Sequence, residues 1–321
     1  MVYEQFQKAV KESLEERFGS GYSLTLQSIT KNNGLTLDGI CISRPQEHTA
    51  PAIYLQTFYD TYKKGKSFPQ VVDEIMELYQ TQHLPDDNFI EELHSENPLT
   101  DRIIFRLINE PANRTLLTDL PHISLPDLDL SLIFCLSLNK KEDQLLTAII
   151  HNSHQKLWNL STEDLYEYAK LNTPDLFPAQ ISSLMEVIKE IARKSSDTEI
   201  KEEDWSGLFE PSPLSPPMYV LTNPYGVHGA ACMFYEGILK DFADSMEGDL
   251  IILPSSIHEV LLIPHSNHIS YEELAETVFS INQEEVPQED RLSNHIYHYS
   301  RSKNHLSVAF TSSFPIGTMN P

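Results

Sequence analysis

The stretch SLTLQSITKNNGLTLDGICIS, Ser23 to Ser43, decides much of the fold class. Apolar and polar residues alternate on both sides of Asn32-Asn33-Gly34. Alternation with a period of two is typical of strands with one buried face, and Asn-Gly accepts the positive φ angles of a tight turn. The sequence therefore predicts a β-hairpin over residues 22–43.

Helical patterns stand on both sides of this hairpin. Apolar residues recur at helical spacing from Val2 to Phe18, with lysines and glutamates between them. Two further helices follow, one from Ile53 to a closing Gly65 and one from Phe68 to Tyr79. Their tyrosines and phenylalanines are interpreted as core packing, because aromatic residues at helical spacing are the ordinary core pattern.

The middle of the chain predicts strands and then helices. Two strands joined by a proline-rich connection are expected over 101–138, with a partner strand over 144–151. A helix follows that begins after Ser161 as N-cap and stops before Pro174, and another is expected near 179–194.

An acidic stretch rich in proline and serine, 196–217, is the predicted domain boundary or long exposed loop. Its Trp205, Leu208 and Phe209 suggest that part of it docks on another surface. The predicted class is α+β with mixed sheets and flanking helices. An N-terminal α+β region, 1–195, would be joined through 196–217 to a C-terminal α/β region, 218–321.

The C-terminal region predicts a strand at 218–223, a helix within GVHGAACMFYEGILKDFADSM, and two short strands around Pro254. A last helix begins after Ser270, with Glu273 at the capping-box position.

Composition narrows the classes of function. The 321 residues include 47 acidic and 23 basic ones, a formal net charge of -24. Such a charge repels phosphate backbones, so nucleic acid is a poor partner. No GxGxxG or GxxxxGK[ST] pattern occurs, which disfavours Rossmann and P-loop nucleotide binding. Three scattered cysteines, no secretory leader and no long apolar window predict a soluble cytoplasmic protein.

The first candidate site is PSSIHEVLL, residues 254–262, where His258 and Glu259 interrupt an apolar run. In a strand, neighbouring side chains point to opposite faces, so one of the two would point inward and need a partner. His228, His265 and His268 are the candidate partners. A metal site would use His258, His265 and His268, although the spacing is not HExxH. A catalytic site would use Ser256 or water as nucleophile, with Glu259 or His258 as base. The alternative is a hydrogen-bonded histidine on a half-buried strand.

Two other stretches have candidate chemistry. NPYGVHGAA, residues 223–231, could present backbone N–H groups to an anion, or its small residues could allow a helix to pack closely on a sheet. A group of amides, carboxylates and one histidine in residues 106–130 could bind a hard cation, although Asx turns and caps explain it more simply. Its members are Asn109, Asn113, Asp119, His122, Asp127 and Asp129. His295 and His298 are interpreted as surface or a subunit contact.

Residues 219–264, from YVLTN through GAACMFYEGILKDFADSMEGDLIILPSSIHEVLLIP, resemble an uncharacterised bacterial family of unknown function that is common in the genomes of gut anaerobes. The upstream stretches NNGLTLDGICI, PAIYLQTFYDTYKKG, RLINEPANRTLLTDLPHISLPDLDL and STEDLYEYAKLNT extend the resemblance over residues 25–300. PSSIHEV is its most recognisable signature. The resemblance implies no activity, cofactor or ligand.

Two hypotheses follow. The first is a non-enzymatic cytoplasmic protein that binds another protein or a small ligand. The alternative is a metal-assisted or Ser/His hydrolase centred on His258 and Glu259. The enzyme requires one of these side chains to face a cleft on which another polar group, such as His228, converges. The sequence indicates no cofactor and no oligomeric state.

Overall fold

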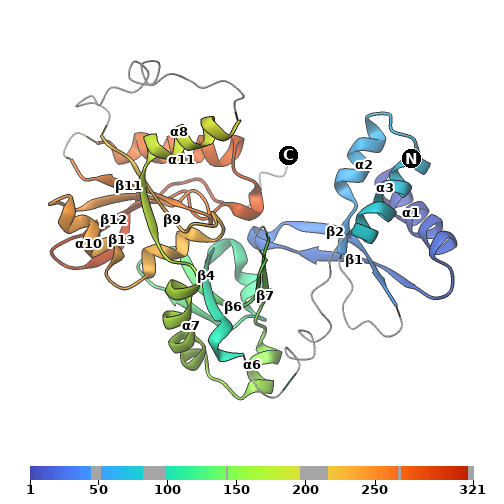
Figure 1. The fold of residues 1–321 in the computed structure, drawn as a ribbon. Helices are drawn as coiled ribbons and strands as arrows, with labels where there is room; N and C mark the ends of the chain where they lie inside the picture. The colour runs from blue at the N-terminus through green and yellow to red at the C-terminus, as the bar shows by residue number, and fades with distance from the viewer. Residues whose placement is uncertain are drawn as a thin grey trace. The chain divides into compact units, whose positions relative to one another are not determined.

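The structure is a computed structural model that describes residues 1–44, 52–81, 95, 99–141, 144–195, 216–266 and 269–316. It divides into two compact units, Met1–Pro98 and Leu99–Pro321 (Figure 1). This division does not follow the predicted one. Strand β8 (Gln180–Ser183) pairs with β9 (Tyr219–Thr222), so strands from both sides of the predicted linker share one sheet. Residues 196–215, with Trp205, Leu208 and Phe209, lie outside the described residues.

The first unit is a three-stranded antiparallel sheet with helices. Its elements are α1 (Tyr3–Phe18), β1 (Ser23–Thr30), β2 (Thr36–Ser43), β3 (Ala52–Tyr54), α2 (Gln56–Lys63) and α3 (Phe68–Thr81). The strand order is β1-β2-β3. The predicted hairpin is confirmed, since β1 pairs with β2 from Ser23↔Ser43 to Thr30↔Thr36. Asn33 and Gly34 adopt φ angles of 58° and 70° at its turn.

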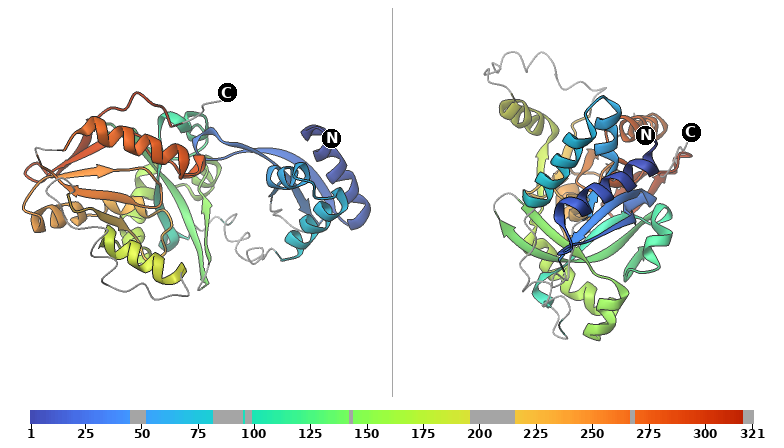
Figure 2. Two further views of the ribbon diagram at one scale, coloured as in Figure 1. Left: turned by 90° about the horizontal axis from the view of Figure 1, so that it is seen from above. Right: turned by 90° about the vertical axis from the view of Figure 1, so that its right-hand side faces the viewer.

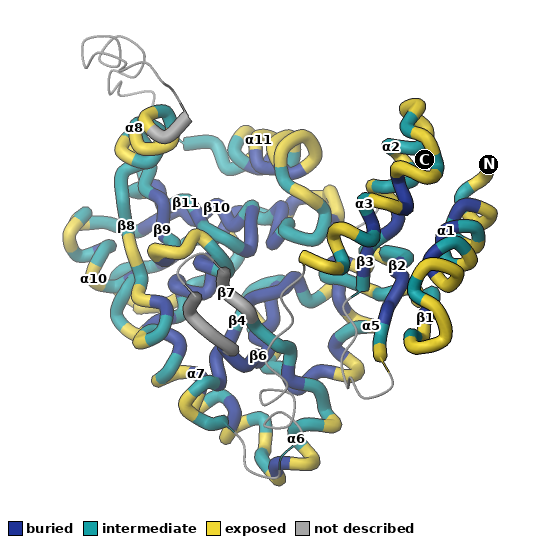
Figure 3. Tube along the Cα trace, turned by 45° about the vertical axis from the view of Figure 1, so that its right-hand side comes forward, coloured by how far each residue is buried: buried dark blue, intermediate teal, exposed yellow. Residues whose placement is uncertain are grey.

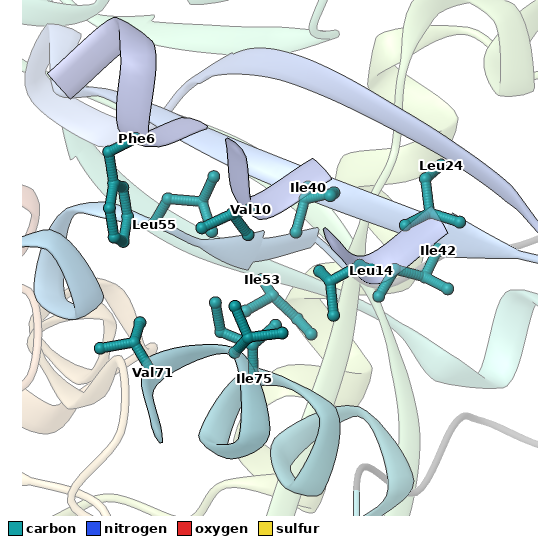
Figure 4. Packing of buried hydrophobic residues seen from close by; sticks show 11 residues of the cluster. Phe6, Val10, Leu14, Leu24, Ile40, Ile42, Ile53, Leu55, Val71 and Ile75 are labelled. Carbon is teal, nitrogen blue, oxygen red and sulfur yellow. The ribbon is translucent and has the colours of Figure 1, made fainter. Parts of the chain in front are cut away.

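The core of this unit lies between one face of the sheet and the helices (Figure 4). Phe6, Val10 and Leu14 of α1 meet Ile40 of β2 and Ile75 of α3, and all five are fully buried. The aromatic residues of α2 and α3 pack around this cluster. The interpretation of the aromatic pattern as core packing is therefore confirmed.

The second unit contains two sheets. The smaller is formed by β4 (Ile103–Asn109), β5 (His122–Leu125), β6 (Leu130–Lys141) and β7 (Gln144–Ile149). Its order is β4-β6-β5, and β7 also pairs with β6. Helix α7 (Thr162–Leu176) is fixed to β4 where the Phe105 amide donates to Thr173 Oγ1 over 3.1 Å. The short helices are α5 (Arg114–Leu117) and α6 (Asn152–Trp158).

The larger sheet has the order β13-β12-β10-β11-β9-β8. Besides β8 and β9, its strands are β10 (Leu250–Leu253), β11 (Val260–Pro264), β12 (Ile296–Ser300) and β13 (His305–Phe310). The helices of this region are α8 (Leu184–Ser195), the 3-10 helix η4 (Gly229–Phe234), α10 (Ile238–Ser245) and α11 (Tyr271–Glu284). Helix α11 lies along the sheet (Figure 2), and its Val278 packs against Ile251 and Ile263.

The α+β class is confirmed, but the sheets are not mixed as predicted, because every described strand pairing is antiparallel. Buried residues lie both in the strands and on the helix faces that cover them, and many exposed residues lie on helices and turns (Figure 3). Among the described helices, none has the length and apolar character needed to cross a membrane.

Several element ends differ from prediction for local reasons. Helix α7 continues through Pro174 to Leu176, because a proline in the last turn removes a single hydrogen bond near an end that is already open. The helix expected near 179–194 begins at Leu184, since the residues before it extend into β8. The helix expected after Gly226 is split into η4 and α10 at Gly237, whose φ is 82°.

Candidate functional site

His258 and Glu259 do not lie in a strand, so the predicted alternation of their side chains is wrong. They occupy the loop between β10 and β11, and β11 begins only at Val260. Ser256 Oγ accepts the His258 amide over 2.9 Å, a local side-chain turn that replaces strand pairing. The Ile257 amide donates to the Asp290 carbonyl over 2.8 Å and fixes the loop.

Both ring nitrogens of His258 have protein partners. The His228 amide donates to Nδ1 over 3.3 Å, and Nε2 lies 3.2 Å from Asp290 Oδ1. Because Nδ1 accepts a hydrogen, the ring proton is on Nε2 and points to the Asp290 carboxylate. The His258 side chain is 29% exposed. One side of the ring is therefore exposed to solvent, while both ring nitrogens have protein partners.

His228, one of the partners suggested for His258, lies directly beside it. The two rings stack with centroids 5.8 Å apart and planes at 27°. His228 begins η4 in the left-handed region, with φ at 55°. Its Nε2 lies 2.7 Å from the Arg106 guanidinium, which can only donate, so this nitrogen is unprotonated. Burial, then Arg106 and His258, lowers the pKa of His228 to about 2. The imidazole stays neutral at any physiological pH.

The structure brings Ser256 and Glu259 together through a hydrogen bond, but neither ring nitrogen of His258 contacts the Ser256 hydroxyl. Ser256 is 4% exposed, and its hydroxyl oxygen accepts the His258 amide. Burial raises the pKa of the Glu259 carboxyl, against the lowering effects of His258 and a hydrogen bond with Ser256. Since both nitrogens of His258 are engaged elsewhere, neither is available to activate Ser256 as the rings stand.

Arg106, in the middle of β4, was not singled out in the sequence. Its guanidinium donates to His228 Nε2 and to Thr147 Oγ1 over 3.4 Å, and it also lies beside the Cys135 thiol. All three partners are neutral. Arg17 and Arg301, by contrast, pair with the carboxylates of Asp73 and Asp244. A half-buried guanidinium that has no carboxylate partner among the described residues is unusual in a chain with 47 acidic residues.

A small cavity adjoins this guanidinium and is called the Arg106 pocket below. Its volume is about 10 Å³, which is room for about one water molecule. Arg106, His228 and Asn223 contribute polar atoms, and Phe177 and Tyr235 are among its apolar walls. The signal that could have found Arg106 is a lone cation inside the apolar run IIFRLIN, the same kind of signal that drew attention to His258.

The loop 223–231 does not form the predicted backbone cradle for an anion. The amides of Tyr225, Gly226, His228 and Ala230 all donate to protein acceptors. The alternative of close packing is confirmed at Gly229. A Cβ there would lie 2.2 Å from Thr222 Oγ1 and 2.5 Å from the His258 carbonyl oxygen.

The predicted metal ligands are not brought together. His258 precedes β11 and His265 follows it, so the two lie at opposite ends of the strand. The His265 ring lies beside His298, with centroids 5.6 Å apart, and His298 Nε2 is 3.2 Å from Asp249. His268 lies outside the described residues. Within the described ranges, no three His, Cys, Asp or Glu side chains are placed to hold a metal ion.

The amides and carboxylates of residues 106–130 separate into different contacts. Asp119 pairs with His151 at 2.8 Å, Asp127 with His305 at 3.6 Å, and His122 Nδ1 contacts the Leu120 carbonyl. The predicted cation cluster is therefore not assembled.

Asp129 is the centre of a separate, nearly buried network. Asn109 Nδ2 donates to it over 2.8 Å, Ser293 Oγ donates over 2.8 Å, and the fully buried Tyr297 hydroxyl also donates. Its side chain is 12% exposed. Ser293 and Tyr297 were not predicted. These bonds link the turn before β6 to β12 and so join the two sheets of the second unit.

The chain belongs to a family described as "Family of unknown function (DUF5688)", which matches residues 3–301. The predicted resemblance to an uncharacterised family over most of the chain is thereby confirmed. No curated protein and no solved structure matches the chain.

Proposed function

We propose that the chain is a non-catalytic cytoplasmic binding protein whose ligand places an anionic group in the Arg106 pocket. The observation that supports this is the half-buried guanidinium, for which the described residues supply only neutral partners. A charge removed from water is costly unless an opposite charge or several strong acceptors compensate it. An anionic ligand group supplies that compensation.

The pocket favours a small monovalent group. Its volume of about 10 Å³ is room for about one water molecule, so the group that enters would be a small anion or one oxygen of a carboxylate in place of water. A carboxylate suits the guanidinium, because a hydrogen bond between an ionised donor and an ionised acceptor is stronger than one between neutral groups. His228 contributes no opposing positive charge, since its pKa is lowered to about 2.

The hydrolase alternative has less support from the geometry. His258 would have to break its contact with Asp290 or with the His228 amide before it could accept a proton from a nucleophile. Two features favour it: burial raises the pKa of the half-buried Glu259 carboxyl, and this carboxyl has a hydrogen bond with Ser256.

The test measures the line width of the ³⁵Cl⁻ resonance, which broadens when chloride exchanges with a protein site. The wild type, Arg106→Gln and Arg301→Gln are compared, because Arg301 is a matched arginine already paired with Asp244. We expect excess broadening in the wild type and in Arg301→Gln, its loss in Arg106→Gln, and its reversal by formate or acetate. Equal broadening in the wild type and Arg106→Gln would contradict the proposal.

A further inference from the structure

In the described part of the chain, strand β1 is a long edge strand with no strand paired on its outer side. It spans eight residues, Ser23–Thr30, and lies at one end of the order β1-β2-β3. Five of its residues are exposed: Ser23, Thr25, Gln27, Ser28 and Thr30. The edge strand β8 has only four residues, and the outer side of β13 is covered where the Val308 amide donates to the Asp127 carbonyl over 3.1 Å.

The backbone groups that β1 turns outward follow from the hairpin. The Lys31 amide donates to the Leu35 carbonyl over 2.6 Å, so residue 31 points its amide toward β2. Backbone direction alternates along an antiparallel strand. Leu24, Leu26, Ser28 and Thr30 therefore direct their N–H and C=O groups away from β2. In the described part of the chain these groups have no backbone partner.

The usual protections of an edge are missing from β1. Proteins commonly guard open edges with lysine, proline, bulges or very short strands. The sequence SLTLQSIT contains no charged residue and no proline, and its register with β2 runs without a bulge. Such an edge is a template for another strand.

We propose that β1 pairs antiparallel with β1 of a second copy of this chain, so that two three-stranded sheets form one six-stranded sheet. A second copy is the favoured occupant because the strand is uncharged. Where two copies of β1 meet around a two-fold axis, no like charges face each other. Elsewhere two copies would repel each other, because each chain has a formal net charge of -24. The proposed contact lies in the first unit, Met1–Pro98, whereas the Arg106 pocket lies in the second.

The register of the seam is restricted. Outward-facing residues must meet outward-facing residues, and the two registers that pair the most residues place either Leu26 or Gln27 opposite its own copy. In both registers the side chains of Thr25 and Gln27 lie close to those of the second copy. Seven paired residues form a small interface, so the dimer is expected to be reversible and concentration-dependent.

Analytical ultracentrifugation over a concentration series tests the proposal, with Thr25→Lys/Gln27→Lys as the variant. The matched control is Gln180→Lys/Ser182→Lys, which places two lysines at the same spacing on the edge strand β8. We expect a monomer–dimer equilibrium in the wild type and in the control, and at least about tenfold weaker association in the β1 variant. Circular dichroism checks that each variant is folded.

Three results would overturn the proposal. They are a wild type that stays monomeric at the highest concentration reached, a dimer equally stable in the β1 variant, and a dimer weakened only by the β8 control. The last result would assign the interface to the other edge.

Discussion

The neutral His228 predicts a specific loss of stability in mild acid. Its pKa in the folded chain is about 2, while the same side chain in the unfolded chain titrates near its usual value of 6.5. Below pH 6.5 the unfolded state binds a proton at His228 that the folded state does not bind. The contribution of the neutral His228 to the free energy of unfolding is therefore present above pH 6.5, and it is lost as the pH falls from 6.5 toward 2.

The size of the effect follows from the two pKa values. At pH 7 the unfolded histidine is about one quarter protonated, and at pH 5.5 it is about nine tenths protonated. Linkage converts this into a loss of about 1.2 kcal/mol in the free energy of unfolding between the two values. His228→Asn removes the titrating group and keeps a residue that tolerates the left-handed backbone, here with φ at 55°.

The assay is urea unfolding at both pH values in the wild type and His228→Asn. The chain has two tryptophans, and a Trp205→Phe background leaves Trp158, which is 5% exposed, to report on the second unit. The histidines that do not contact His228 contribute equally to both proteins, so their effect cancels in the comparison. We expect the wild type to lose about 1.2 kcal/mol more than the variant. An identical pH dependence in the two proteins would refute the neutral, buried state of His228.

Two further predictions concern stability. Gly229→Ala is expected to destabilise the second unit by about 3 kcal/mol or more, because its Cβ would meet Thr222 Oγ1 at 2.2 Å, whereas Gly248→Ala, with its nearest atom at 3.8 Å, is nearly neutral. Thermal unfolding measures both, and equal melting temperatures would contradict the packing argument. Asp129→Asn should cost about 1–3 kcal/mol, because the amide cannot accept all the hydrogen bonds that the carboxylate accepts. The exposed Asp127→Asn is its control in urea unfolding, and a similar small effect in both would show that the Asp129 network is dispensable.

Local patterns in the sequence predicted the local structure well. The hairpin over residues 22–43 depends on neighbours along the chain, because the turn residues and the alternation set its register without help from elsewhere. The helix after Ser161 was predicted for the same reason, since Ser161 Oγ accepts the Asp164 amide over 3.0 Å as a capping residue should. The C-terminal end of this helix was predicted wrongly, because Pro174 is tolerated in the last turn, where α7 packs on β4.

Long-range pairing could not be read from the sequence. Nothing in residues 180–183 indicates that they pair with residues 219–222, and the composition change between them suggested a boundary instead. The contact between Arg106 and His228 joins residues 122 positions apart. His258 was singled out correctly as an unusual position, but its surroundings depend on Asp290 and His228, which only the folded chain brings to it.

Asp129 and Arg106 show why one buried charge is interpreted as structural and the other as a binding group. The Asp129 carboxylate accepts hydrogen bonds from Asn109, Ser293 and Tyr297, so its charge is compensated by donors that the chain itself supplies. Arg106 has several N–H donors, yet its described partners are a neutral imidazole, a hydroxyl at 3.4 Å and a thiol. Protonating the imidazole would add a second positive charge and worsen the imbalance. The chain therefore completes the environment of Asp129 by itself, whereas the described partners of Arg106 leave its charge uncompensated, which is why we propose an anion there.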